Sequence, residues 1–388
     1  MKNRTLLMIP GPIEFEPVVL AALGAPTTSH WAPNFIETFG QALERMRDVF
    51  LSEDGQPFVL PGSGTLAMDS VGASLVEPGD KVVMVNTGFF SDRYGALLER
   101  YGAKVTHLRA PVGGRPSLEE VEKVLRQGGF KLLAVTHVET STGVITEIQS
   151  LATLAHNHGA MIVVDGVCSV AGEELRMTEW NIDVALTASQ KAIGVPPGLA
   201  LFVAGPQAMQ AFKARKTPVP NYYADWGNWL PVMQAYEGRQ LGYFGTPAVN
   251  LVWALNASLG LILAEGMDAR FARHTTISKA FKAGINALGL SQVPRKAEFA
   301  AHMMTAARYP KGVESSAFLA KVAKAGAYLA GGLHPAIKNE YFRIGHMGST
   351  QLGDVLATLG AIEVALKECG HQFQAGAGVE AAAKSYLA

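Results

Sequence analysis

The amino-acid sequence predicts an α/β fold with a mostly parallel sheet of seven strands and helices on both faces. Between residues 57 and 205, short apolar runs alternate with amphipathic stretches, and glycines fall between them. Apolar strands separated by helical patterns are typical of parallel sheets that are buried on both faces. Glycine is common at such junctions because it adopts positive φ without strain.

Seven apolar runs are expected to form the strands. They are Phe58–Leu60, Lys81–Val85, Lys104–Leu108, Lys131–Thr136, Met161–Asp165, Val184–Thr187 and Leu199–Val203. Helical patterns lie between several of these runs, at Thr65–Leu75, Ser91–Tyr101, Leu118–Arg126 and Ile148–His158. This alternation is the pattern expected of strand–helix–strand units in one sheet.

The chain after residue 205 divides into a segment without clear periodicity and a second alternating section. Residues Thr217 to Phe244 are rich in Pro, Asn, Trp and Tyr, which predicts a long aromatic loop with a functional or interfacial role. Helices are expected at Ala248–Ala264, Arg270–Leu288, Ser316–Lys324 and Leu352–Lys367, and strands at Ala300–Ala307 and Tyr341–Ile344. We therefore expect a large domain over residues 15–265 and a smaller C-terminal α/β domain over residues 266–388, joined by an N-terminal arm of residues 1–14.

Composition excludes several classes of protein. Lys+Arg and Asp+Glu each total 33 among 388 residues, so no excess of positive charge favours nucleic acid. The only cysteines, Cys168 and Cys369, are too few for a disulfide framework, and no metal-binding signature is present. No apolar run reaches the length of a membrane span. We expect a soluble intracellular protein with no metal, nucleic-acid or membrane partner, and its compartment (cytoplasm, peroxisome or mitochondrion) stays open.

Lys191 and Asp165 each follow or end an apolar run, so the predicted sheet presents both at its edge. Pyridoxal phosphate chemistry requires such a pair. The lysine forms a Schiff base with the cofactor, and the carboxylate keeps the pyridine nitrogen protonated so that the ring can accept electrons. A lone lysine after a strand is more commonly just solvated, so the interpretation depends on the neighbouring motifs.

The motif Pro61–Thr65 follows the first predicted strand and opens a helix. Its glycines and the free N–H groups of a helix start form a phosphate site, to which Ser63 and Thr65 can add hydroxyl donors. The same glycines fit the weak dinucleotide pattern G-x-G-x-x-A. Asn86, rather than an acid that could bind ribose, follows the next strand, which weakens the alternative of a nicotinamide-dependent dehydrogenase. A plain helix entry is the remaining alternative.

Two more polar or aromatic clusters follow predicted strands. Phe89 and Phe90 could stack on a planar cofactor, although packing in the core is the commoner use of such a pair. The hydroxyl-rich segment Thr136–Gly143 could contact the same cofactor. All these motifs lie after successive strands, on the side where open α/β sheets bind their ligands.

These motifs resemble those of the class V, fold-type I aminotransferases of the alanine–glyoxylate and serine–pyruvate group, and the resemblance runs nearly from end to end. The most specific segments are Val164–Ser169, Ala188–Gly194 and Phe342–Gly348, whereas Gly62–Thr65, Phe90–Arg93 and Tyr243–Pro247 resemble the fungal alanine–glyoxylate branch. The resemblance implies a pyridoxal 5′-phosphate enzyme that moves the amino group of alanine or serine to glyoxylate by a ping-pong mechanism. Its products would be glycine and pyruvate or hydroxypyruvate, which implies a role in glycine biosynthesis and glyoxylate detoxification.

The resemblance also implies a role for particular residues. Lys191 would carry the cofactor, Asp165 would pair with its ring nitrogen, and Val167 would pack on one face of the ring. Phe90 would stack on the other face, where many relatives have Trp. The cofactor phosphate would be surrounded by Ser63, Gly64, Thr65 and Gln190.

Contacts with the substrate and with a second subunit are implied in the same way. Either Thr140 or Ser141 would contact the cofactor. Tyr243 and Thr246 would reach the phosphate in the neighbouring subunit, which implies a homodimer whose active sites are shared. Arg343 would bind the substrate carboxylate with its planar fork of donors. Because glyoxylate is small, we expect a small pocket, closed near Pro12, His30 and the loop of Tyr222 and Tyr223.

Several alternatives stay open within the same fold. Serine–pyruvate and 3-hydroxykynurenine transaminases resemble the chain in the same motifs. A cysteine desulfurase needs a mobile nucleophilic cysteine, and neither Cys168 nor Cys369 suits that role. A phosphate-bearing substrate would need extra cations, for which Arg93, Arg239 and His346 are candidates.

Overall fold

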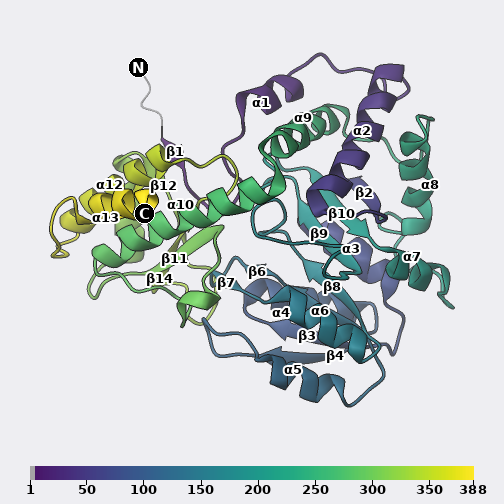
Figure 1. Ribbon diagram of the computed structural model, residues 1–388, viewed down its shortest axis with the longest axis horizontal. Coiled ribbons are helices and arrows are strands. Elements are labelled where there is room, and N and C mark those ends of the chain that lie inside the picture. Colours follow the sequence, from purple (N-terminus) through teal and green to yellow (C-terminus); the bar gives the residue numbers. More distant parts are fainter. Residues whose placement is uncertain (1–4) are drawn as a thin grey trace.

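The computed structural model describes residues 5–388, and a seven-stranded sheet lies at its centre (Figure 1). The seven predicted runs form its strands, which confirms the predicted fold class. In spatial order the strands are β2 (Gln56–Pro61), β10 (Leu199–Ala204), β9 (Val184–Ala188), β8 (Met161–Asp165), β5 (Phe130–Thr136), β3 (Lys81–Asn86) and β4 (Lys104–Arg109). In this sheet β10 runs antiparallel to both of its neighbours, β2 and β9, and the other neighbouring strands pair in parallel.

Helices cover this sheet, and every residue of β8, β9 and β10 is buried as a result. Among the helices, α2 packs against β2, α3 against β9 and β10, and α6 against β8. The helices of this large part are α1 (Pro17–Leu23), α2 (Pro33–Phe50), α3 (Gly64–Leu75), α4 (Phe89–Arg100), α5 (Leu118–Leu125), α6 (Ile148–Asn157), α7 (Pro206–Lys213), α8 (Trp226–Glu237) and α9 (Val249–Glu265). A short hairpin of β6 (Val138–Glu139) and β7 (Val144–Ile145) follows β5.

The parallel strands end along one edge of the sheet, and their register aligns the polar residues there. Thr136 at the end of β5 lies beside Asp165 at the end of β8, and Asp165 lies beside Leu186 of β9. The turn that carries Lys191 follows β9 directly. The sheet therefore brings Asp165 and Lys191 to the same edge, as parallel strand ends should.

A smaller part, drawn in green to yellow, lies beside the large one (Figure 1). The long helix α10 runs between the two. The elements from α10 to the end of the smaller part are α10 (Met267–Ala287), the 3-10 turn η1 (Ala297–Phe299), β11 (Met304–Arg308), α11 (Ser315–Lys324), β12 (Ala327–Tyr328), β13 (Ala330–Gly331), β14 (Tyr341–Gly345), α12 (Leu352–Glu368) and α13 (Ala377–Leu387). Strands β11, β14 and β13 form a three-stranded antiparallel sheet.

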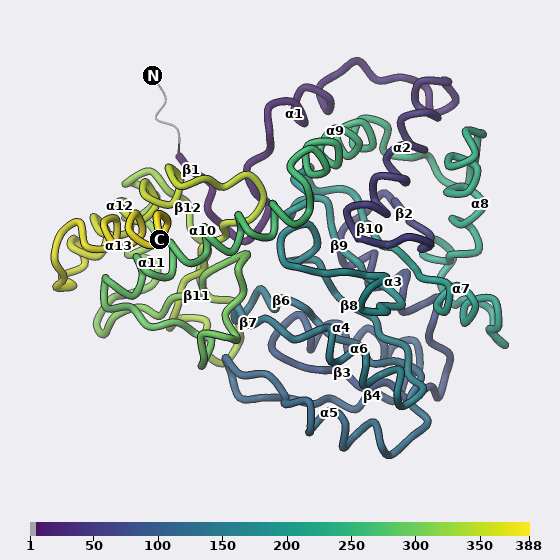
Figure 2. The backbone as a smooth tube through the Cα atoms, in the orientation of Figure 1, coloured from purple at the N-terminus to yellow at the C-terminus, as the bar shows by residue number. Residues whose placement is uncertain are grey.

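The N-terminal segment connects the two parts. Strand β1 (Leu6–Leu7) pairs with β12, and the chain then passes to α1, which packs on α9 (Figure 2). Residues 1–4 of the expected arm lie outside the described residues. Buried hydrophobic side chains form two clusters, and the larger one includes Met267 and Phe271 of α10. The domain boundary between residues 265 and 266 therefore stays a prediction.

The prediction of a long loop over residues 217–244 was wrong, because the segment contains the 12-residue helix α8. Asp225 caps this helix by accepting a hydrogen bond from the N–H of Gly227 (2.7 Å). Its buried residues recur at helical spacing: Trp226, Trp229, Val232, Met233 and Tyr236. Pro231 lies inside the helix. The Pro- and Trp-rich composition conceals the helical period in the sequence. Burial of the apolar face nevertheless stabilises the helix.

The strand expected over residues 300–307 begins later, at Met304. Lys282 Nζ of α10 donates to the carbonyls of Ala300 (3.1 Å) and Ala301 (2.8 Å). The N–H of Ala301 donates to the carbonyl of Gly143 (3.0 Å). This segment therefore contacts the large part and α10 before it joins its own sheet.

Within residues 5–388, each helix taken singly falls short of the length and apolarity that would cross a membrane. Helices α9 and α10 meet that test only when they are counted together, and the chain bends by 84° between them.

Candidate active site

A cavity of about 200 Å³ lies at the edge where β5, β8 and β9 end. Polar and aromatic groups from several loops converge on it. Of the predicted site residues, those that line it are Ser63, Gly64, Thr65, Phe90, Thr140, Asp165, Val167, Gln190 and Lys191. Residues more than a hundred positions apart thus meet in one small space.

Lys191 lies inside this cavity with only 9% of its surface exposed. Its Nζ donates a hydrogen bond to the carbonyl of Pro10. Gly11 packs directly on the lysine: it adopts a φ of 93°, and a Cβ there would lie 2.6 Å from Lys191 Cδ. Burial lowers the pKa of Lys191, and the nearby guanidinium of Arg343 acts in the same direction. Such an amine is more readily neutral, as a nucleophile or a base must be.

Asp165 is also buried, with 3% of its surface exposed. Its Oδ1 accepts from the N–H of Val167 (3.0 Å) and its Oδ2 from the hydroxyl of Thr136 (3.2 Å). Burial raises the pKa of Asp165 to about 7, and the carboxylate of Glu139 adds to the rise. A carboxylate that lacks sufficient partners in the protein suits a cationic group of a ligand.

The start of α3 forms a second polar wall of the cavity. Ser63 is the N-cap residue, yet its hydroxyl makes no capping bond to the helix. Gly64 lies tightly against the sheet, since a Cβ there would be 3.0 Å from the Cβ of Ala188 and 3.1 Å from Val167 Cγ2. On the other side, the buried Oε1 of Gln190 has no hydrogen-bond partner among residues 5–388. Unsatisfied donors at a helix start are suited to a phosphate group.

Phe90 and Val167 are the apolar groups of the cavity wall that the sequence singled out. Phe90 lies in the first turn of α4, with its ring 5.3 Å from that of Phe89 in an edge-to-face contact at 84°. Thr140 lines the cavity, whereas the adjacent Ser141 does not. The hydroxyl of Ser141 instead donates to Glu139 Oε1 (2.7 Å) and accepts from the N–H of Phe89 (3.0 Å).

Arg343 lies on β14 and reaches the active-site region from the smaller part, although it does not itself line the cavity. Its Nε donates to the carbonyl of Gly331 (2.8 Å) and its Nη1 to that of Thr140 (3.4 Å). Burial lowers its pKa. The guanidinium is therefore held beside Thr140 by backbone contacts, within electrostatic reach of Lys191.

Tyr243 and Thr246 lie away from the cavity of their own chain. Tyr243 is 61% exposed, its hydroxyl is 3.5 Å from Thr246 Oγ1, and its ring stacks on His30 at 5.5 Å. Pro12, His30, Tyr222 and Tyr223 do not line the cavity of the single chain, so the expectation that they close the pocket stays a prediction. Gly11 and Met68 line it instead.

Of the three extra cations considered for a phosphate-bearing substrate, only Arg93 lines the cavity. Arg239 is paired with Glu37 (3.0 Å) and Glu44 (2.8 Å). His346 is fully buried, and burial holds its pKa well below its ordinary value.

Glu139 has no predicted role, although it lies in the hydroxyl-rich segment Thr136–Gly143. Its carboxylate is fully buried between Phe90, Ser91 and Ser141. An acid within a run of hydroxyl residues just after a strand was the available signal.

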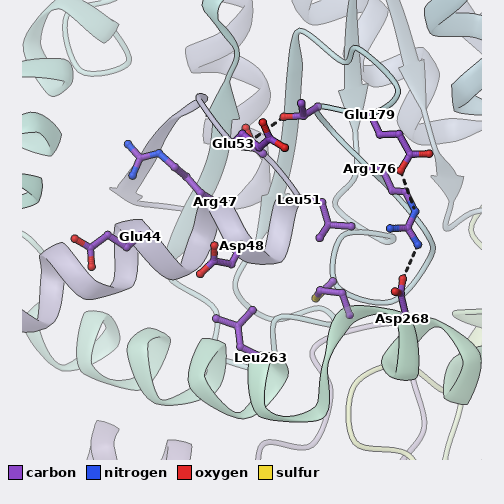
Figure 3. Close-up of a pocket in the computed structure, with 12 residues that line it drawn as sticks. Glu44, Arg47, Asp48, Leu51, Glu53, Arg176, Glu179, Leu263 and Asp268 are labelled. Carbon is purple, nitrogen blue, oxygen red and sulfur yellow. Dashed lines mark hydrogen bonds and ion pairs between the residues drawn. The ribbon is translucent and has the colours of Figure 1, made fainter.

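A larger hollow of about 980 Å³ lies elsewhere on the molecule (Figure 3). Arg176 lies between Glu179 and Asp268 on one side of it, and Asp48 and Leu263 lie on the other. Its lining contains neither a lysine nor an aromatic ring. Its size therefore does not make it the reactive site, whose chemistry lies at the sheet edge.

The residues of the small cavity fit pyridoxal 5′-phosphate. A buried lysine, a buried carboxylate with a raised pKa and an uncapped helix start converge there. Such a fold and site define a lysine-dependent pyridoxal phosphate enzyme.

Comparison with known proteins gives the family. Residues 20–349 match the model of the aminotransferase class-V family, and the chain belongs to that family, whose cofactor is pyridoxal 5′-phosphate. The chain is 37% identical to alanine–glyoxylate aminotransferase 1 of Saccharomyces cerevisiae, over 90% of this chain and 93% of that protein. It is 32% identical to serine–glyoxylate aminotransferase of Arabidopsis thaliana, over 99% of this chain and 96% of that protein.

Solved structures agree with this assignment. The crystal structure of ureidoglycine–glyoxylate aminotransferase from Bacillus subtilis matches with a TM-score of 0.93 and 27% identity, over 100% of this chain and 99% of that one. Membership of the family decides against the nicotinamide-dependent dehydrogenase. Asn86 instead donates a hydrogen bond to Asp92 (2.7 Å) beside the start of α4.

Proposed function

We propose that this aminotransferase transfers the amino group of alanine to glyoxylate and forms pyruvate and glycine. The observation that carries the transaminase chemistry is the burial of Lys191 and Asp165 in one cavity. Glyoxylate is the acceptor named for the yeast, plant and bacterial relatives. In a cell this reaction would form glycine and remove glyoxylate.

When bound, pyridoxal phosphate supplies an electron-accepting ring that stabilises negative charge at the α-carbon of the amino acid. In this proposal Asp165 holds the proton on the ring nitrogen. Phe90 and Val167 flank the two faces of the ring. The phosphate is held by Ser63, Gly64, Thr65 and Gln190. Thr140, rather than Ser141, contacts the cofactor, because Ser141 is already bound to Glu139.

Lys191 moves the proton in the proposed reaction. Its lowered pKa favours the neutral amine, so Nζ can take the proton from the α-carbon of the amino acid and later return it. The carbonyl of Pro10 accepts a hydrogen bond from Nζ and orients it. Gly11 leaves the space in which the lysine lies, and any side chain there would displace it.

Arg343 binds the substrate carboxylate in this proposal. Its Nε and Nη1 are anchored on the carbonyls of Gly331 and Thr140, which limits the freedom of the guanidinium before the substrate arrives. Charge-assisted bidentate bonds from arginine then fix the amino acid in one orientation. Serine, which would give hydroxypyruvate, would be bound through the same carboxylate.

The proposed assembly is a homodimer in which Tyr243 and Thr246 of one subunit complete the phosphate site of the other. In support, both residues lie outside their own cavity, and Tyr243 presents an exposed ring. Large exposed aromatic side chains commonly mark protein interfaces.

The chemistry is tested by the visible spectrum of the purified protein and by borohydride trapping followed by peptide mapping. We expect a yellow chromophore whose label maps to Lys191, and its loss in Lys191→Ala. Lys282→Ala is the matched control, because Lys282 is a second lysine with a lowered pKa that lies outside the cavity. An unchanged spectrum in Lys191→Ala would refute the assignment.

The amino donor is tested separately by half-reactions with alanine, serine, phosphoserine and 3-hydroxykynurenine. We expect alanine to discharge the chromophore with the highest kcat/KM. A higher value for serine or 3-hydroxykynurenine would replace alanine with that donor and leave the transaminase chemistry in place.

A further inference from the structure

The first turn of α4 and the turn after β6 are joined by one buried side chain, that of Glu139. We propose that Glu139 is a positioning residue that holds Phe90 and Thr140 at the cofactor. The inference rests on the proposed function, because the place of Phe90 matters to the reaction only if its ring stacks on pyridoxal phosphate.

One oxygen of Glu139 binds the start of α4. Its Oε2 accepts from the N–H of Phe90 (3.1 Å), from the N–H of Ser91 (3.0 Å) and from the hydroxyl of Ser91 (3.1 Å). The N-cap of this helix, Gly88, has no side chain that could accept these bonds. A carboxylate beside a helix N-terminus is stabilised by the exposed N–H groups and by the helix dipole.

The other oxygen binds the turn that follows β6. Oε1 accepts from the N–H of Ser141 (3.0 Å) and from its hydroxyl (2.7 Å). Ser141 in turn accepts from the N–H of Phe89 (3.0 Å), which closes a ring of hydrogen bonds between the two segments. Thr140 lies between Glu139 and Ser141, so its direction toward the cavity depends on this anchoring.

The packing around the carboxylate shows that the backbone leaves space for it. A Cβ on Gly88 would lie 2.5 Å from Ser141 Oγ and 2.7 Å from Glu139 Cγ. Glu139 is fully buried, so its charge is compensated by these donors rather than by water. The hydrogen bonds of this buried carboxylate join two segments, and each segment carries a residue that lines the cavity, Phe90 in one and Thr140 in the other.

The smaller part contains a matched control for a purely structural role. Glu363 of α12 is also a buried carboxylate that accepts from backbone N–H groups, those of Gly376 (2.7 Å), Gly378 (2.9 Å) and Val379 (3.3 Å). It does not line the cavity or contact a residue that does. Replacing either glutamate by glutamine keeps the shape of the side chain but turns one acceptor into a donor that faces N–H groups.

The experiment compares Glu139→Gln with Glu363→Gln in the full-length protein, loaded with and stripped of pyridoxal phosphate. We expect both variants to melt at lower temperature than the wild type. Only Glu139→Gln should bind pyridoxal phosphate more weakly, by roughly tenfold, the size expected when a buried charged hydrogen-bond network is disrupted. Only this variant should also lose intensity in the visible circular dichroism of the bound cofactor, which reports a fixed ring environment.

A double-mutant cycle tests whether Glu139 acts through Phe90. In a Phe90→Leu background the effect of Glu139→Gln on the Kd of pyridoxal phosphate should become clearly smaller, because the ring that it positions is gone and only its effect through Thr140 remains. If Glu139→Gln fails to fold, Glu139→Asp takes its place. The shorter side chain keeps the charge but cannot reach both segments, so the same weakening is expected.

The inference is overturned if Glu139→Gln binds pyridoxal phosphate like Glu363→Gln, or if its effect is unchanged in the Phe90→Leu background. Failure of the proposed function is distinguishable, because the wild type itself would then lack a chromophore linked to Lys191.

Discussion

At the scale of single residues, burial acts on Lys191 and Asp165, two of the charged groups that line the cavity. It lowers the pKa of Lys191 and raises that of Asp165, because low dielectric surroundings disfavour either charge. The hydrogen bonds from Val167 and Thr136 compensate the Asp165 carboxylate only in part. A cationic ring nitrogen beside Asp165 would provide the missing partner.

This predicts how the stability of the cofactor-free protein depends on pH. The folded pKa of Asp165, about 7, lies above the unfolded value of about 4, so the unfolded state releases this proton first. The contribution of Asp165 to the free energy of unfolding should therefore fall as pH rises from about 4 to about 7, by a few kcal/mol at most.

Chemical denaturation of the wild type and of Asp165→Asn across this range measures the effect. We expect the free energy of unfolding of the wild type, relative to that of Asp165→Asn, to fall over this range, because the variant has no carboxyl to ionise. Equal slopes in the two proteins would show that Asp165 ionises in the folded state at its ordinary pKa.

At the scale of elements, α3 and α5 each begin after a serine, but only the serine before α5 caps its helix. Ser117 accepts from the N–H of Glu120 and forms a complete capping box at the start of α5. Ser63 makes no such bond at the start of α3. The start of α3 therefore retains free donors, as a phosphate site needs.

We predict that removing the Ser117 hydroxyl affects stability, whereas removing the Ser63 hydroxyl affects cofactor binding. Ser117→Ala should lower the free energy of unfolding by about 1 kcal/mol, with or without pyridoxal phosphate, because a capping bond is lost. Ser63→Ala should leave the cofactor-free protein nearly unchanged but raise the Kd of pyridoxal phosphate about tenfold or more, since a hydrogen bond to a charged group contributes about 1.5–3 kcal/mol. Thermal melts and fluorescence titrations measure both. A destabilised cofactor-free Ser63→Ala protein would contradict this division of roles.

Several elements could be predicted from the sequence and others could not. The seven strands of the main sheet have apolar runs long enough to recognise, and their ends agree with the structure to within two residues. Helix α8 was missed because Pro231 and the tryptophans obscured its period. This segment is helical because its apolar face is buried against the rest of the large part, and burial is a property of the whole fold rather than of local composition.

At the scale of the whole molecule, the exposed aromatic residues require an explanation. Tyr222 is 81% exposed, and Trp31 and Tyr243 are each 61% exposed. Apolar surface of this kind is unfavourable in water unless a partner covers it. The proposed homodimer would cover it and would bring Tyr243 to the phosphate of the second subunit.

Subunit complementation tests the shared site. Lys191→Ala and Tyr243→Ala variants, each expected to be defective alone, should regain pyridoxal phosphate binding when they are unfolded and refolded together. Each mixed dimer would then contain one site with both residues intact. If Tyr243 served its own subunit, mixing would restore nothing, and sedimentation of the wild type as a monomer would reject the dimer itself.

By itself, the sequence determined the sheet, the polar residues at its edge, and the presence of both Lys191 and Asp165 there, because strand periodicity and strand ends are local properties of the chain. Only the tertiary structure decided that the carbonyl of Pro10 meets Lys191, that Arg343 contacts Thr140, and that Glu139 joins two segments. The first two of these contacts join residues 181 and 203 positions apart. Such contacts depend on how whole elements pack, and no local pattern encodes that packing.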